Sequence, residues 1–169
     1  MYTSFLGALS RRFTAEDLAW KPVAILREQG KARVVPYVTN RAIMDRLDQV
    51  CGPENWRNEY LPGPNGGLLC GISIRLVRED HTSEWVTKWD GAENTQLEPV
   101  KGGLSSSMRR AAVQWGIGRY LYRIPPVLAQ VDEKGRLTER PQMPPEYLPE
   151  RVEPRRLRPA AMRLREVAA

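Results

Sequence analysis

The residues with the clearest chemical meaning lie between positions 101 and 123, in the stretch KGGLSSSMRRAAVQWGIGRYLYR. This stretch carries only positive charges, because no Asp or Glu occurs between Glu98 and Asp132. Its cations are Lys101, Arg109, Arg110, Arg119 and Arg123. On a solvated helix, basic side chains commonly pair with acids three or four residues away. Cations without such partners indicate contact with an external polyanion, and phosphate groups are the obvious candidate.

Three cations outside this stretch extend the candidate phosphate-binding set. Arg41 lies at the start of an apolar helical pattern, and Arg78 follows a run of alternating apolar residues. Lys88 lies between Trp85 and Trp89, and basic residues interleaved with aromatic ones are typical of surfaces that stack bases. The predicted set is therefore Arg109, Arg110, Lys101, Arg78, Arg41 and Lys88.

Motifs for enzymatic chemistry are missing from the sequence. There is no Walker loop, GxGxxG or GxSxG, which argues against ATP-driven work and serine-esterase chemistry. The single histidine, His81, has no partner ligands around it. Glu84, Asp90 and Glu93 could supply carboxylates to a two-metal nuclease, but no motif fixes their spacing, and exposed strand-end charges are the other interpretation. We expect a protein that is not an enzyme and needs no cofactor. A metal-dependent nuclease is one alternative, and an RNA-binding or structural ring-forming module is another.

The cationic stretch predicts one long helix that ends at Arg123, before Pro125. At about 100° per residue, its apolar residues fall on two opposite stripes. The first stripe contains Leu104, Met108, Ala111, Trp115, Gly118 and Tyr122, and the second contains Val113, Ile117 and Leu121. One stripe is enough to cover a sheet, so the second requires another layer of the same domain or a neighbouring subunit. We favour the subunit, which makes Val113, Ile117 and Leu121 the predicted oligomer interface.

Upstream of this helix, the apolar residues alternate with a period of two. Residues 56–61, 68–78 and 84–90 are predicted to be strands of an antiparallel meander. The helix would cover its apolar face, and the opposite, wetter face would carry Arg75 and Lys88. The predicted fold class is therefore α+β, with a three-stranded β-meander, a long helix packed across it, N-terminal helices and a disordered C-terminal tail.

The N-terminal third predicts two helices and one extended segment. Thr14 and Asp17 have the spacing of a capping box at a helix start, and Thr39 or Asn40 caps a second helix that stops at Gly52. Between them, residues 32–38 are rich in β-branched side chains but contain a proline, which favours an edge strand or an extended lead-in.

Length and composition bound the remaining possibilities. The 169 residues, with a net charge of +6, allow one domain, predicted over residues 1–131, and a Pro/Arg-rich disordered tail over residues 132–169. Cys51 and Cys70 form no CxxC pair, which favours reduced thiols in the cytosol. Because neither a convincing signal peptide nor a membrane-spanning run is found, we expect a cytoplasmic, nucleoid-associated protein without membrane contact.

Two strings resemble a known family. YVTNRAIMDRLDQVCGPENW at 37–56 and, after the predicted meander, KGGLSSSMRRAAVQWGIGRYLY at 101–122 are similar to the single-strand annealing family typified by the eukaryotic Rad52 recombination protein, and especially to a bacterial branch of it. The resemblance covers about residues 10 to 128. It implies a β-β-β-α unit that assembles into a homo-oligomeric ring and binds single-stranded DNA in a basic groove without ATP. It also implies a role in DNA repair, through annealing or through protection of 3′ ends.

The resemblance also implies site residues. Arg109 and Arg110 stand at the positions of the family's basic inner-groove pair. Arg78, near the tip of the second predicted hairpin, matches a position where the family has a basic residue of a second, outer DNA site. Lys101 falls in a basic patch at the helix start. Two positions depart from the family pattern. Val113 stands where the family often has a further basic residue. Arg41 is offset by one residue from the family's arginine in the preceding helix. The groove is therefore expected to be built slightly differently or to bind DNA more weakly.

Overall fold

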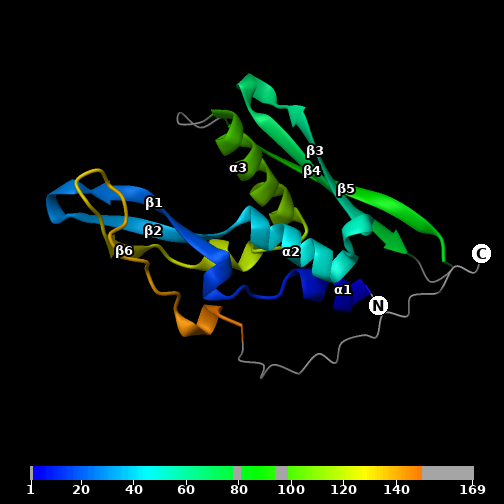
Figure 1. Cartoon of the computed structure of the whole chain (residues 1–169), viewed down its shortest axis with the longest axis horizontal. Coiled ribbons are helices and arrows are strands. Elements are labelled where there is room, and N and C mark those ends of the chain that lie inside the picture. Colours follow the sequence, from blue (N-terminus) through cyan, green and yellow to red (C-terminus); the bar gives the residue numbers. More distant parts are fainter. Residues whose placement is uncertain (1, 78–80, 94–98, 150–169) are drawn as a thin grey trace, which may run out of the picture.

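The fold combines two three-stranded antiparallel sheets with three α-helices, within the residues that the computed structural model describes: 2–77, 81–93 and 99–149 (Figure 1). Sheet A has the order β1 (Leu18–Leu26), β2 (Lys31–Val38) and β6 (Val127–Gln130), and sheet B has the order β3 (Trp56–Pro62), β4 (Leu68–Val77) and β5 (Ser83–Ala92). The α-helices are α1 (Tyr2–Leu9), α2 (Asn40–Cys51) and α3 (Pro99–Gln114). Short 3-10 helices are η1 (Ala15–Asp17), η2 (Arg27–Gln29), η3 (Pro53–Asn55), η4 (Pro64–Gly66), η5 (Arg119–Arg123) and η6 (Pro145–Tyr147).

Sheet B and α3 form the predicted β-β-β-α unit, which is confirmed. The side chains of Cys70, Ile72 and Ile74 on the central strand β4 are fully buried beneath α3. The buried indole of Trp115, just after α3, donates a hydrogen bond to the backbone oxygen of Ile72 at 2.9 Å. Since a buried Trp N–H needs an acceptor, this bond fixes the position of the C-terminal end of α3 along β4.

The predicted length of the long helix is wrong, because α3 ends at Gln114. Gly116 has a φ of 90°, its N–H donates to Val113 O, and Ile117 N donates to Ala112 O. This pair of bonds around a left-handed glycine is a Schellman motif, which terminates a helix. Gly118 has a φ of 68° and turns the chain again, into η5.

The early stop overturns the premise of the predicted oligomer interface. Ile117 and Leu121 do not continue a second stripe of α3; they are 0% and 6% exposed in the chain's own core. Their side chains therefore have no surface to offer a neighbouring subunit. Val113, in the last turn of α3, is half-buried and lines a hollow described below.

Sheet A was not predicted as a sheet. Thr14 and Asp17 do form the capping box, but they start only the single turn η1, and the chain then runs directly into β1. The predicted segment at 32–38 is strand β2, in the middle of sheet A, yet Pro36 is compatible with this position. β6 pairs only with residues Lys31 to Val34, so Pro36 has a partner strand on one side alone.

Helix α2 matches its prediction closely. The Thr39 side chain caps it by accepting a hydrogen bond from Ala42 N at 3.2 Å, and Gly52, with a φ of 84°, follows its last residue. Its buried residues Ala42, Ile43 and Leu47 join the main core, so α2 links the two sheets.

The predicted disordered tail is wrong for residues 132–149, which pack on the domain. Val131 and Leu137 form a β-bridge, and Met143 is only 7% exposed. The Arg140 side chain donates hydrogen bonds to Ala15 O and Leu18 O, because the backbone acceptors beside η1 face it. The rest of the predicted tail lies outside the described residues.

Both cysteines are free thiols. Burial raises the pKa of Cys51 and that of Cys70 to about 11.

Among the described residues, no helix has both the length and the apolar character needed to cross a membrane.

Candidate nucleic-acid interface

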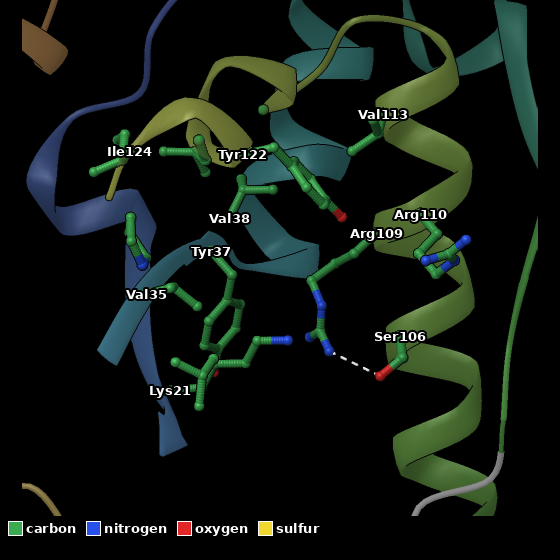
Figure 2. Close-up of a pocket in the computed structure, with 14 residues that line it drawn as sticks. Lys21, Val35, Tyr37, Val38, Ser106, Arg109, Arg110, Val113, Tyr122 and Ile124 are labelled. Atoms are coloured by element: carbon green, nitrogen blue, oxygen red, sulfur yellow. Dashed lines mark hydrogen bonds between the residues drawn. The ribbon is translucent and has the colours of Figure 1, made fainter. Parts of the chain in front are cut away.

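A hollow of about 380 Å³ lies between sheet A and α3, and we call it the Arg109 hollow. One wall comes from β1 and β2, the other from α3, and the chain after α3 closes one end. The lining residues that carry charge or an aromatic ring are Lys21, Tyr37, Arg109, Arg110 and Tyr122. Figure 2 shows Arg109 reaching from α3 toward Tyr37, while Arg110 stays over the helix surface.

Two hydroxyls and an aromatic ring hold Arg109 in place. Its Nη1 donates to Ser105 Oγ and its Nη2 donates to Ser106 Oγ, each at 3.0 Å, and the guanidinium lies 4.8 Å from the centroid of the Tyr37 ring. Ser105 and Ser106 precede Arg109 by four and three residues, so one face of α3 presents both hydroxyls to it. Among the described residues, no carboxylate lies within ion-pair distance of Arg109.

The environment of Arg109 favours a bound anion. Partial burial lowers its pKa, and the neighbouring Tyr37 and Tyr122 oppose that change. An arginine stays protonated at neutral pH even so, because its ordinary pKa lies far above neutral pH. A half-buried guanidinium that lacks a carboxylate is only partly compensated by hydroxyls and rings, so a phosphate oxygen would find a strong donor there.

A second hollow, of about 520 Å³, begins on the other side of Arg109. Tyr37 and Arg109 line both hollows, so they stand where the two meet. Arg41 contributes an exposed cation to the second hollow, from the first turn of α2. Arg41 and Arg109, both in the predicted set, therefore line the same hollow. The acids of this hollow are Glu16, Asp17 and Asp45.

Arg110 has a different environment from Arg109. Its Nε and Nη2 both lie 2.9 Å from Oδ1 of Asp90, on strand β5. The same carboxylate accepts a hydrogen bond from Gln114 Nε2 at 3.2 Å and one from Gly91 N at 2.7 Å. Partial burial raises the pKa of Asp90, but the hydrogen bonds from Gly91, Gln114 and Arg110, together with the charge of Arg110, outweigh it and hold that pKa below its usual value.

Lys88 does not lie on the face of sheet B where it was placed with Arg75. It is opposite Ile72 on the helix-facing side, whereas Arg75 is opposite Trp85 on the outer side. Its Nζ donates to Gln114 O at 3.0 Å and lies 4.6 Å from the centroid of the Trp115 ring. Lys88 therefore neutralises the negative end of α3, a structural role that the strand pattern did not reveal.

The remaining predicted cations are Lys101 and Arg78. Lys101 is exposed in the first turn of α3 and is not among the residues that line either hollow. Arg78 lies outside the described residues, so its contact with DNA stays a prediction.

Sequence reasoning missed three of the five charged or aromatic residues that line the Arg109 hollow: Lys21, Tyr37 and Tyr122. Lys21 belongs to a strand that was not predicted. Tyr37 lies in the first string that resembles the annealing family, and Arg109 lies in the second. No local pattern in the sequence predicts that these two residues contact each other. Tyr122 was assigned to the inner stripe of a helix, and it is instead 70% exposed because α3 ends before it.

The carboxylates of the alternative nuclease site are not gathered. Glu84 and Asp90 are six residues apart on β5, a separation of about 20 Å along an extended strand. Asp90 is already bound to Arg110. Among the described residues, no group of three His, Cys, Asp or Glu side chains could hold a metal ion.

Comparison with known proteins gives consistent results. Residues 3–138 match the sequence model of the Rad52/22 family double-strand break repair protein. The single-stranded DNA-binding protein DdrA of Deinococcus radiodurans is 35% identical over 144 residues, which cover 84% of this chain and 62% of that relative. The protein of the same name from Deinococcus deserti is 34% identical over 148 residues, which cover 86% of this chain and 68% of the relative. The chain therefore spans about two thirds of the length of these relatives.

Proposed function

Because the chain belongs to the Rad52/22 family of double-strand break repair proteins, we propose that it binds single-stranded DNA along the two hollows that meet at Arg109. The observation that carries the proposal is the half-buried Arg109 guanidinium, which is held by two serine hydroxyls and an aromatic ring and, within the described part of the chain, has no carboxylate partner. Both relatives are named for binding single-stranded DNA.

The mechanism rests on counterion release. Arg109, Arg41 and Lys21 line the hollows from three different elements, so a strand that passes Arg109 would meet cations from α3, α2 and β1. Neutralising phosphates releases condensed counterions, which drives binding without ATP and with little sequence preference. Such a protein acts by occupying the strand and not by cleaving it. Shielding of 3′ ends and annealing of complementary strands in the cytoplasm, at the nucleoid, are the repair roles that we propose for it.

The direct test uses a fluorescently labelled oligothymidine and its anisotropy, in EDTA and without ATP. We expect saturable binding that weakens by orders of magnitude between about 50 and 200 mM salt. Unlabelled single-stranded DNA should compete better than duplex DNA or RNA. Equal or better competition by RNA would favour an RNA-binding module, and cleavage of the probe when Mg²⁺ or Mn²⁺ replaces EDTA would favour a nuclease. Salt-independent binding would contradict the phosphate mechanism.

We also propose that the protein forms a homo-oligomeric ring, and the outer face of sheet B supports this proposal. That face carries large apolar side chains that are well exposed: Leu61 is 49% exposed, Val77 61%, Trp85 42% and Trp89 38%. Exposed apolar patches of this kind mark protein contacts in soluble proteins. This surface replaces Ile117 and Leu121 as the candidate interface.

Multi-angle light scattering tests the interface. Val77→Glu adds a charge to the outer face without opening the core, so we expect particles of smaller mass. Met44→Glu is the matched control, since Met44 is an exposed apolar residue on α2 and not on the outer face of sheet B, and its substitution should leave the mass unchanged. A wild-type protein of monomer mass would contradict the ring. An unchanged mass for Val77→Glu would contradict this interface alone.

A further inference from the structure

The edge of the Arg110 guanidinium that would bind a phosphate is already occupied by Asp90. Arginine binds phosphate and carboxylate groups best through two parallel N–H groups on one edge of its guanidinium. In Arg110, the Nε and Nη2 edge faces Asp90 Oδ1, with both nitrogens at 2.9 Å. A phosphate oxygen that approached this edge would have to take the place of the carboxylate oxygen.

Asp90 is firmly held in this position. Gly91 N and Gln114 Nε2 also donate to its carboxylate, and its side chain is only 20% exposed, against 51% for Arg110. Its pKa lies below the usual value, so the carboxylate stays ionised at neutral pH. The pair joins β5 to α3 at the surface, where ion pairs contribute little to folding stability. A purely structural role therefore accounts poorly for the position of Asp90 against Arg110, a cation that lines the Arg109 hollow.

We propose that Asp90 is a positioning residue that acts through Arg110: it competes with DNA phosphate for the Nε and Nη2 edge of this arginine and so limits the affinity of the groove for single-stranded DNA. This inference rests on the proposed function. It divides the neighbouring arginines into two classes. Arg109, which has no carboxylate partner among the described residues, makes the primary phosphate contact, and Arg110 makes one only when Asp90 is displaced.

The Asp90–Arg110 pair affects how tightly a strand is held. Because Asp90 occupies Arg110, each protomer neutralises one phosphate fewer than it would if both Arg109 and Arg110 bound DNA. Each phosphate contact contributes about 0.7 to the slope of log K against log salt for single strands. The wild-type protein therefore binds with a shallower slope than a variant in which Arg110 is released, and a bound strand exchanges more readily.

The test is the salt dependence of oligothymidine binding by Asp90→Asn. Asparagine keeps the shape of the side chain, and its oxygen can still accept from Gly91 N, but it has no charge to hold Arg110. We expect a slope steeper by about 0.7 for each protomer that the oligonucleotide contacts and, at low salt, an affinity about tenfold higher than that of the wild type. Asp90→Glu keeps a competing carboxylate and should behave like the wild type. A thermal melt of each variant confirms that the fold is intact.

Two controls isolate the mechanism. Asp132→Asn makes the same change in net charge and frees Arg136 from its ion pair at 2.7 Å, away from the hollows, so it should leave the slope unchanged. Arg110→Ala should abolish the gain when it is combined with Asp90→Asn. If Asp90→Asn binds with the wild-type slope, or if its gain persists without Arg110, the inference is wrong while the proposed function stands. A wild-type protein that binds no single-stranded DNA overturns both.

Discussion

The guanidinium of Arg109 lies over the ring of Tyr37, 4.8 Å from its centroid, and this contact joins α3 to sheet A at the point where the two hollows meet. Tyr37 comes from β2 and Arg109 from α3, so the hairpin that was not predicted provides half of the site. The ring limits where the cation can point, which leaves the guanidinium oriented before any ligand arrives. Preorganised donors lose less entropy when they bind.

The first prediction concerns this contact. Replacing Tyr37 with Leu removes the cation–π interaction and the orientation of Arg109, so affinity for single-stranded DNA should fall about three- to tenfold. Tyr37→Phe keeps the ring and should bind like the wild type. Anisotropy titrations at one salt concentration measure both. If Leu and Phe variants bind equally well, the ring does not position the arginine.

The second prediction concerns the end of α3. Gly116→Ala forces a side chain into a backbone with φ of 90° and brings its Cβ to 2.8 Å from Ser10 Oγ. We expect it to lower the free energy of unfolding by about 1–2 kcal/mol or more, measured by urea denaturation. Gly7→Ala is the control, because nothing lies within 4 Å of a Cβ at this position in α1. There the exchange should stabilise the helix by about 0.5–1 kcal/mol. Equal effects at the two positions would contradict the Schellman turn.

The third prediction separates a structural cation from a binding one. Lys88→Met removes the ammonium group that contacts Gln114 O at the end of α3. We expect a loss of about 0.3–1 kcal/mol in the free energy of unfolding and no change in the affinity for single-stranded DNA. A weaker affinity without a loss of stability would return Lys88 to the DNA-binding set.

The sequence was sufficient to predict the elements that local patterns define. Period two over β3, β4 and β5 gave the meander, and Thr39 with Gly52 gave both ends of α2, because strand alternation and helix caps are local signals. The end of α3 was also readable in principle. Gly116 and Gly118 are helix-stop signals, but the apolar stripe that continues through Tyr122 outweighed them in the interpretation.

The rest could not be read from local patterns. Sheet A depends on pairing between β2 and β6, which are about ninety residues apart, and Pro22 and Pro36 weakened the strand signal of the hairpin. The site depended on the same long-range contacts. Arg109 and Arg110 are adjacent in sequence and equally cationic, and only the fold shows that one faces Tyr37 and the other Asp90.

Arg109→Ala tests the central claim most directly, with oligothymidine binding measured across a range of salt. Arg136→Ala is the matched control, since it removes an exposed arginine away from the hollows. We predict that Arg109→Ala lowers the affinity at least about tenfold and makes the slope of log K against log salt shallower by about 0.7 for each protomer that the oligonucleotide contacts, while the control keeps both values. If Arg109→Ala is folded and binds with the affinity and slope of the wild type, the Arg109 hollow is not where the protein holds DNA.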